Sequence, residues 1–137
     1  MSNYIVTGAA GFIGSRVSQL LIEEGHSVIG IDNMNDAYDV RIKEFRLKPL
    51  MALERFTFYK KDIADWEEMK AIAESSSQID GIINLAARAG VRASTTVPFT
   101  MLNSNTNGAL AMLALCRHYN IPKIIQASPP SIYGATP

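Results

Sequence analysis

Three glycines at a spacing of three residues constrain this chain more than any other feature: Gly8, Gly11 and Gly14. They follow a short apolar run at residues 4–6, which predicts a first strand. Gly8 allows a sharp turn off that strand, Gly11 lets a ligand approach the backbone where a Cβ would stand, and Gly14 lets a helix pack closely on the sheet. The pattern predicts a strand, a tight turn and a helix in close succession.

The helix after the glycines is expected over residues 13–24 and ends at Gly25, a residue type suited to a helix C-terminus. Apolar residues at helical spacing support it: Phe12, Ile13, Val17, Leu20 and Leu21. Its N-terminus would offer unpaired N–H groups and the positive end of the helix dipole to a pyrophosphate. The sequence therefore favours a dinucleotide site over a purely structural turn.

Asp32 lies at the position where a dinucleotide site has a carboxylate for the adenosine ribose. A second apolar strand, residues 27–31, ends at Asp32, about twenty residues after the glycines. Asp32 could accept both hydroxyls of an adenosine ribose and would repel a 2′-phosphate. No Arg or Lys stands between Asp32 and Arg41, so the sequence predicts NAD rather than NADP as cofactor. A solvated Asp beside a structural turn is the alternative.

Composition excludes several other classes of protein. The 137 residues suffice for one domain, expected over 1–137, and 47% hydrophobic with 19% charged residues is ordinary for a soluble protein. Thirteen basic residues balance thirteen acidic ones, so no net charge favours nucleic acid or a membrane surface. No signal peptide and no membrane-spanning run are expected, which favours a cytoplasmic location.

The single cysteine and the two histidines are not expected to be catalytic or metal-binding residues. The single Cys116 lies in a helical pattern and is expected to be a small buried apolar residue rather than a reactive thiol. His26 and His118 are expected at helix ends, with no cysteine or carboxylate cluster beside them in the sequence. No metal site is expected.

The rest of the chain alternates strands with helices. After an insertion at 33–39, residues 40–47 predict a helix broken before Pro49. Residues 56–59 have strand composition, and Asp65 with Glu68 forms a capping box for a helix over 66–75.

The second half of the chain continues the alternation. A continuous apolar run at 81–85 predicts a buried parallel strand, and residues 123–127 predict a fifth strand. Between them a long helix is expected, with Pro98 in its first turn. Its apolar pattern includes Leu110, Leu113 and Ala114.

This alternation predicts an α/β fold, a Rossmann-type doubly wound parallel sheet with strands in the order 3-2-1-4-5. Ligands of such sheets bind at the carboxyl ends of the strands, where strands 1 and 4 diverge. The rule selects the glycine turn, Asp32, Asp62, the loop 85–92 and Ser128.

Several motifs together resemble a known family. They are residues 7–14, Asp32-Asn33, Asp62-Ile63 and Leu85-Ala86-Ala87, which are similar to the cofactor motifs of the extended short-chain dehydrogenases/reductases, the nucleotide-sugar epimerases and dehydratases. UDP-glucuronate 4-epimerases are the closer match, through 32–36, 41–50, 56–58, 62–65 and 86–92. The similarity runs the whole length of the chain.

The resemblance implies roles for individual residues. Asp62 would hydrogen-bond the adenine amino group, Ile63 would line its pocket, and 85–87 would pass along the cofactor. Asn105 matches a helix asparagine near the nicotinamide, although a solvent-facing or capping amide is equally open for it. The expected cofactor-binding set is Gly8, Gly11, Phe12, Ile13, Gly14, Asp32, Asn33, Asp62, Ile63, Leu85, Ala86, Ala87, Asn105 and Ser128. Arg88 and Arg92 could face the anionic groups of a sugar nucleotide, or lie on the surface.

The chain departs from the family's catalytic pattern in two ways. The family oxidises C4 of the sugar transiently with NAD, using a Tyr and Lys four residues apart on a helix and a Ser or Thr after the fifth strand. Here Pro129 aligns with the Ser/Thr position, and it has no hydroxyl. Nothing matches the Tyr/Lys helix, because Tyr119 and Lys123 are separated by the helix-breaking Pro122, and Tyr133 matches a different tyrosine.

The expectation is therefore the NAD-binding N-terminal part of a nucleotide-sugar 4-epimerase, truncated before the catalytic helix and without a catalytic residue. A stand-alone NAD-binding module and a fragment of a nucleotide-sugar 4,6-dehydratase are the alternatives. A fifth strand with a bare edge would expose apolar surface, so a homo-oligomer is expected.

Overall fold

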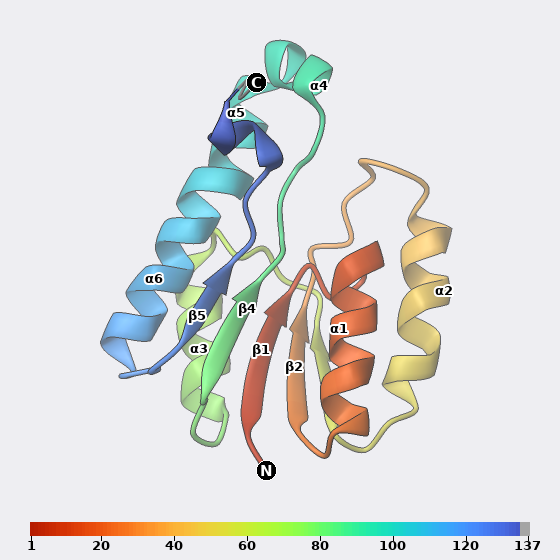
Figure 1. Ribbon diagram of the computed structural model, residues 1–137, viewed down its shortest axis with the longest axis vertical. Coiled ribbons are helices and arrows are strands. Elements are labelled where there is room, and N and C mark those ends of the chain that lie inside the picture. The colour runs from red at the N-terminus through yellow and green to blue at the C-terminus, as the bar shows by residue number, and fades with distance from the viewer. Residues whose placement is uncertain (135–137) are drawn as a thin grey trace.

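Five parallel strands form the centre of the molecule (Figure 1). The computed structural model describes residues 1–134, apart from the side chains of residues 91, 93, 130 and 131. The strands are β1 (Asn3–Thr7), β2 (Ser27–Ile31), β3 (Phe56–Tyr59), β4 (Gly81–Asn84) and β5 (Ile124–Gln126). Their order in the sheet is β3-β2-β1-β4-β5, and each neighbouring pair is parallel. The predicted fold class and strand order are confirmed.

Helices cover both faces of the sheet. They are α1 (Phe12–Glu23), α2 (Val40–Met51), α3 (Trp66–Ser75), α4 (Val91–Thr96), α5 (Pro98–Leu102), a π-helical segment η1 (Asn103–Asn107), α6 (Gly108–His118) and a short 3₁₀ turn η2 (Pro130–Tyr133). Figure 1 shows α1 and α2 on one side of the sheet and α3 and α6 toward the other.

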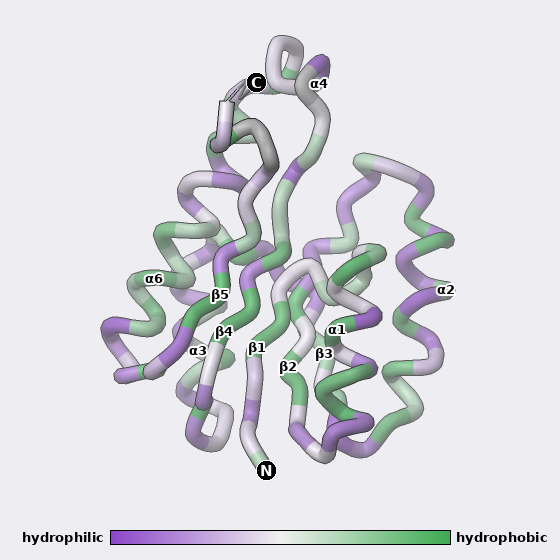
Figure 2. Tube along the Cα trace, viewed as in Figure 1, coloured by the Kyte–Doolittle hydropathy of each residue, from purple (hydrophilic) through white to green (hydrophobic). Residues whose placement is uncertain are grey.

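Neighbouring residues along each strand point to opposite faces and so join two separate cores. Ile5 of β1 packs with α3 and α6 through Met69, Met112 and Leu115. Val6, the next residue, packs with the layer of α1 and α2. Figure 2 shows hydrophobic stretches along the strands and along α6. The sheet is thus buried on both faces near its centre, as expected for a parallel sheet.

Two predicted helix-terminating residues, Gly25 after α1 and Asp65 before α3, form the expected hydrogen bonds. Gly25 follows α1 with φ +88°, and the amides of Gly25 and His26 donate to the carbonyls of Ile22 and Leu21 at 3.0 and 2.9 Å. Such a pair of bonds closes a helix end in a left-handed turn. At α3 the carboxylate of Asp65 accepts from the amide of Glu68 at 3.2 Å, which forms one half of the predicted capping box.

The second half of that capping box is absent. The Glu68 carboxylate lies 2.6 Å from Lys61 Nζ, so it does not return to the amide of Asp65. That amide instead donates to the Asp62 carbonyl at 3.1 Å. A salt bridge to a nearby ammonium has replaced the reciprocal bond.

The helix boundary expected before Pro49 is wrong, because α2 continues through Pro49 to Met51. Pro49 lies in the last turn, so its missing N–H removes a single hydrogen bond near the helix end. Leu47 and Leu50, on either side of it, are buried against the sheet. Their burial holds the last turn in helical form despite the proline.

The expected long helix is divided into α5, η1 and α6, with Pro98 in the first turn of α5 as predicted. The buried residues of α6 are Gly108, Ala111, Met112 and Leu115. Leu110 and Leu113 are 63% and 53% exposed, so these apolar residues do not mark the core. A π-helical turn rotates the residues that follow it relative to a regular α-helix, and sequence spacing alone does not report this.

In α1, too, the apolar residues at the start of the helix are not the ones that pack on the sheet. Phe12 and Ile13 are exposed, whereas Gly14 and Ser18 are fully buried on the sheet side. A Cβ on Gly14 would lie 2.1 Å from the carbonyl oxygen of Gly8 and 2.7 Å from its carbon. The helix therefore packs so closely on the turn that only a glycine fits.

We expect Gly14→Ala to lower the free energy of unfolding by about 2 kcal/mol or more, because the added methyl group meets backbone atoms that cannot rotate away. Urea unfolding followed by far-ultraviolet circular dichroism measures it. Arg16→Ala on the exposed side of the same helix is the control and should change stability by no more than about 0.5 kcal/mol. Equal stability of Gly14→Ala and the wild type would contradict this packing.

Candidate functional site

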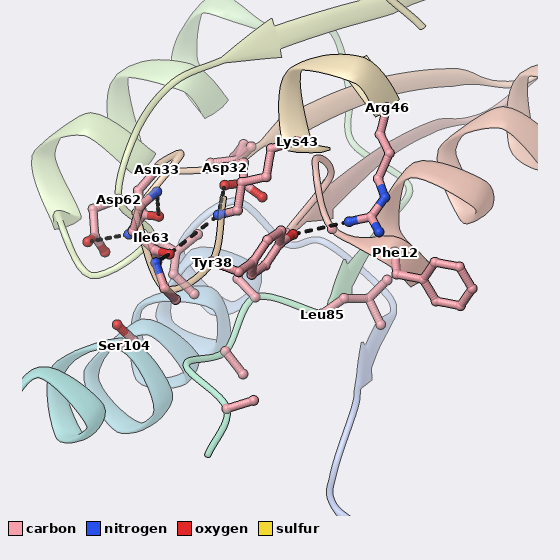
Figure 3. A pocket seen from close by; sticks show the side chains of 18 of the residues that line it. Phe12, Asp32, Asn33, Tyr38, Lys43, Arg46, Asp62, Ile63, Leu85 and Ser104 are labelled. Carbon is pink, nitrogen blue, oxygen red and sulfur yellow. Dashed lines mark hydrogen bonds and ion pairs between the residues drawn. The ribbon is translucent and has the colours of Figure 1, made fainter. Parts of the chain in front are cut away.

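A cleft of about 460 Å³ opens at the carboxyl ends of β1, β2 and β4 (Figure 3). Its walls come from the glycine turn, the loop after β2, helix α2, the loop after β3 and the loop after β4. Ten of the predicted cofactor-binding residues line it: Gly8, Gly11, Phe12, Asp32, Asn33, Asp62, Ile63, Leu85, Ala86 and Ala87. The cleft also includes residues that the sequence did not indicate.

The glycine turn brings the N-terminus of α1 to this cleft. Gly8 has φ +66°, a left-handed conformation, and its carbonyl accepts from the amide of Gly11 at 2.9 Å. No side chain caps α1. The amides of Phe12 and Ile13 have no acceptor within the described part of the chain. This helix end thus presents free N–H groups and a positive dipole beside the cleft.

Asp32 lies in the cleft wall and is only 5% exposed. Its Oδ2 accepts from the Ala10 amide at 3.2 Å, and its Oδ1 accepts from the Met34 amide at 2.8 Å. Lys43 of α2 places its Nζ 3.1 Å from the same Oδ1, and its side chain is 6% exposed. A buried ion pair therefore joins the end of β2 to α2.

Lys43 was not predicted as part of the site. It lies eleven residues after Asp32 and beyond Arg41, and the fold brings α2 back over the end of β2. Lys43, Leu47 and Leu50 are all buried and lie at helical spacings of four and three residues, which was the available signal for a buried face on α2. Residues 33–40 hold no cation, as the sequence shows, but in the folded chain the Lys43 ammonium lies 3.1 Å from Asp32 Oδ1.

Asp62 and Asn33 meet on the opposite side of the cleft. The side-chain amide of Asn33 donates to Asp62 Oδ2 at 3.1 Å, and the Ala64 amide donates to Oδ1 at 2.9 Å. Ile63 beside them is buried, and its Cδ1 would lie 2.5 Å from a Cβ on Gly108. This part of the cleft combines a fixed carboxylate with an apolar wall.

A buried polar network supports the floor. The hydroxyl of Thr7 bonds to Asn84 Oδ1, and it accepts from the amides of Leu85 and Ala86 at 3.1 and 3.0 Å. Asn84 Nδ2 then donates to Gln126 Oε1 at 2.7 Å. These bonds fix the start of the loop after β4, and no such bonding role was predicted for Thr7 or Asn84.

Aromatic and cationic side chains form the rim. The Arg46 guanidinium lies 5.5 Å from the ring centre of Phe12 and 5.9 Å from that of Tyr38, and it donates to the Tyr38 hydroxyl at 3.2 Å. Lys43 Nζ lies 5.3 Å from the same Tyr38 ring. Figure 3 shows Arg46 and Phe12 at one end of the cleft and Asp62 at the other.

Comparison with known proteins shows the family to which the chain belongs. The family model described as GDP-mannose 4,6 dehydratase matches residues 5–137. The chain belongs to this family. A curated relative, UDP-glucuronate 4-epimerase of Thermodesulfobacterium geofontis, is 48% identical over 134 residues, covering 98% of this chain and 41% of the relative. Protein CapI of Staphylococcus aureus is 44% identical, covering 96% and 39%.

The fold has close structural relatives as well. The crystal structure of UDP-glucuronic acid 4-epimerase from Bacillus cereus in complex with UDP-glucuronic acid and NAD matches with a TM-score of 0.86 and 32% identity. The match covers 98% of this chain and 42% of that one. The chain therefore spans about two fifths of the length of the relatives it matches. The resemblance to nucleotide-sugar epimerases and dehydratases is confirmed.

Four members of the expected cofactor-binding set do not line the cleft: Ile13, Gly14, Asn105 and Ser128. Gly14 is buried under the glycine turn, and the Ile13 side chain is exposed. Ser128 is exposed beyond β5, next to Pro129. Their side chains do not contribute to the wall of the cleft.

Asn105 is exposed, in agreement with the expected solvent-facing alternative, and it also makes two specific hydrogen bonds. From η1, its Oδ1 accepts from the Arg88 amide at 2.7 Å and its Nδ2 donates to the Arg88 carbonyl at 3.0 Å. This pair of bonds ties the loop after β4 to the π-helical turn. Arg92 is exposed.

Tyr119 does not have the environment of a catalytic base. Its hydroxyl donates to the Glu74 carboxylate at 2.9 Å, and desolvation followed by this bond raises the pKa of the phenol. A proton-abstracting tyrosine needs a lowered pKa. Lys123 lies outside the helix, immediately before β5.

The structure also describes the surroundings of Cys116 and His26. Burial raises the pKa of the half-buried Cys116 thiol, which opposes thiolate formation. The Nδ1 of His26 accepts from the Ser2 amide at 3.2 Å. Within residues 1–134 no group of three or more His, Cys, Asp or Glu side chains could hold a metal ion. No helix in the same range has the length and hydrophobicity to span a membrane.

Proposed function

We propose that this chain is the NAD-binding part of a nucleotide-sugar 4-epimerase of the UDP-glucuronate type. One observation carries the proposal: an uncapped helix N-terminus and a buried carboxylate, Asp32, belong to the same cleft. A dinucleotide has a pyrophosphate that can bind the helix N-terminus and a ribose diol that can bind the carboxylate. The relatives named above, one of them crystallised with NAD and UDP-glucuronic acid, support the choice.

The proposed roles of the residues follow one another along the length of the cleft. The Phe12 and Ile13 amides would hold the pyrophosphate, Asp32 the adenosine ribose, and Asp62 with Ile63 the adenine. Leu85, Ala86 and Ala87 would lie beside the remaining part of the cofactor. NAD, when bound, would supply the hydride acceptor for oxidation at C4 of the sugar.

The described residues orient the cofactor but do not provide the proton transfer. Abstraction of the C4 hydroxyl proton near neutral pH needs a base with a suitable pKa, and Tyr119 is committed to Glu74. Ser128 is exposed and Pro129 has no hydroxyl. We propose that the catalytic groups lie outside residues 1–137 in a longer parent enzyme.

A 4,6-dehydratase is a second candidate, favoured by the description of the family model. Both reactions begin with oxidation at C4, so the cofactor cleft serves either. Formation of a 4-keto-6-deoxy sugar by the parent enzyme would identify the dehydratase.

We expect the chain to bind NAD and Asp32→Ala to weaken that binding by about tenfold or more, because a hydrogen bond to a charged group contributes about 1.5–3 kcal/mol. Calorimetry with NAD and NADP measures it. Asp36→Ala, an exposed carboxylate in the same loop, is the control. Equal affinity of the wild type and Asp32→Ala for NAD would contradict the proposed ribose site.

We expect no conversion of UDP-glucuronate or UDP-glucose by the 137-residue polypeptide saturated with NAD. General acid–base groups contribute about 10²–10⁴ in rate each, and residues 1–134 offer none in place. A chimera that carries the C-terminal part of a relative should gain activity, and Pro129→Ser should raise it further. Turnover by the unextended chain would show that a base has been overlooked.

We also propose that the chain self-associates through exposed apolar surface. Ile125 on the edge strand β5 is 62% exposed, although its register partner Ile83 packs with the layer of α1 and α2. Sedimentation at increasing concentration should show dimers or larger species, and Ile125→Lys should weaken them by placing a charge on the edge. A monomer at all concentrations would oppose this.

A further inference from the structure

Strand β3 forms an open edge of the sheet. It pairs with β2 on one side, and no strand within residues 1–134 lies on its other side. The Val28 amide donates to the Arg55 carbonyl at 2.8 Å, so Arg55 and every second residue after it bond to β2. The carbonyl of Phe56 and both backbone groups of Phe58 therefore point away from the sheet, where another strand could bond to them.

The sequence along this edge is self-complementary. From residue 54 to residue 60 it reads Glu-Arg-Phe-Thr-Phe-Tyr-Lys, with Thr57 at the centre. Residues at equal distances on either side of Thr57 form pairs that attract each other when they lie opposite across two strands. These pairs are aromatic Phe56 with Phe58, cationic Arg55 with aromatic Tyr59, and acidic Glu54 with basic Lys60.

The outer members of this set are available to another chain. Glu54, Arg55, Thr57 and Lys60 are exposed. The three charged residues form no ion pair within the described part of the chain. Charges on an edge strand usually discourage pairing with a second chain. Here, however, the opposite charges lie at matching distances from the centre, so each would meet its complement in a second copy.

We infer that β3 pairs with β3 of a second copy of this chain, antiparallel and about a two-fold axis at Thr57. The two sheets then form one continuous sheet. The Phe58 amide of each copy donates to the Phe56 carbonyl of the other, and Thr57 lies opposite Thr57. Such an interface is isologous, because the same residues contribute from both sides. It is separate from the β5 edge around Ile125.

Charge distinguishes this register from its neighbour. A shift by one residue would place Phe58 on the axis. Arg55 would then lie opposite Lys61, and Glu54 opposite Asp62, of the second copy. Like charges directly opposite each other destabilise an antiparallel pair. The register proposed above avoids both repulsions and gains two opposite-charge pairs instead.

Pairing at β3 leaves the cofactor cleft open. None of residues 54–60 lines that cleft. The carboxyl ends of two antiparallel strands point in opposite directions, so the two clefts would lie at opposite ends of the joined sheet. Dimer formation and NAD binding can therefore be measured separately, and the inference does not depend on the proposed function.

Charge reversal tests the pairing in solution. Sedimentation equilibrium is measured on chains that carry Ile125→Lys, which removes the association proposed through β5. Glu54→Lys and Lys60→Glu should each raise the dissociation constant of the dimer by about tenfold or more, because each turns two attractions into two repulsions. The double variant Glu54→Lys/Lys60→Glu should restore the dimer. Glu44→Lys, on the exposed surface of α2, is the control and should leave the constant unchanged.

Mixing the two single variants gives a second test. Glu54→Lys chains repel one another, and so do Lys60→Glu chains. In a mixed pair, a lysine lies opposite a glutamate at both ends of the strand. The mixture should therefore form a heterodimer at concentrations where each variant alone is a monomer. Far-ultraviolet circular dichroism checks that every variant folds.

Crosslinking tests the position of the axis. Thr57 would lie in a pair without hydrogen bonds, where opposite Cα atoms are about 4.5 Å apart, within the range that a disulfide spans. In a chain with Cys116→Ala, Thr57→Cys should therefore form a disulfide-linked dimer under mild oxidation. Lys48→Cys, at an exposed position on α2, is the control and should crosslink much more slowly.

Three results would overturn the inference. One is a monomer at all concentrations. Another is a dimer whose dissociation constant is the same in Glu54→Lys, Lys60→Glu and the parent chain. The third is a dimer that these charges leave unchanged but that Leu113→Glu abolishes, which would assign the contact to the exposed side of α6.

Discussion

The close contact between the backbone of Gly14 and the carbonyl of Gly8 controls the geometry of this molecule. Because a Cβ on Gly14 would lie 2.1 Å from that oxygen, helix α1 can sit directly on the turn that leaves β1. The helix N-terminus is thereby held at the carboxyl edge of the sheet, with unpaired amides at Phe12 and Ile13. The electrostatic character of the cleft follows from this backbone contact.

The floor and the side wall of the cleft are stabilised differently. At the floor, the Thr7 hydroxyl fixes the Leu85 and Ala86 amides, and a Cβ on Gly8 would lie only 3.0 Å from the Ala86 nitrogen. At the side wall, α2 is held to the strand end by the Lys43–Asp32 ion pair. The floor is therefore defined by backbone sterics and by the Thr7 hydroxyl, whereas the wall depends on a buried pair of side-chain charges.

Sequence periodicity predicted the strands because those signals are local, and the right-handed crossover rule for alternating strands and helices then supplied their order. Burial on both faces, glycine turns and capping residues such as Asp65 act within a few positions of the chain. It could not predict the Lys43–Asp32 pair or the exposure of Leu110, because both depend on how separate segments meet in space. Ten predicted residues line the cleft, while Asn105 binds the backbone of Arg88 instead.

The distribution of charge along the cleft gives a ligand its direction. Asp62 lies at one end, the Asp32–Lys43 pair is neutral as a unit, and the positive helix terminus and Arg46 lie at the other end (Figure 3). An extended ligand with one uncharged end and a pyrophosphate in its middle matches this order in only one orientation. For the cofactor proposed above, that orientation would place the uncharged adenosine at Asp62 and leave the rest of the ligand along the loop after β4. A ligand that carries a redox ring must bind in one orientation if the same face of that ring is always to meet the substrate.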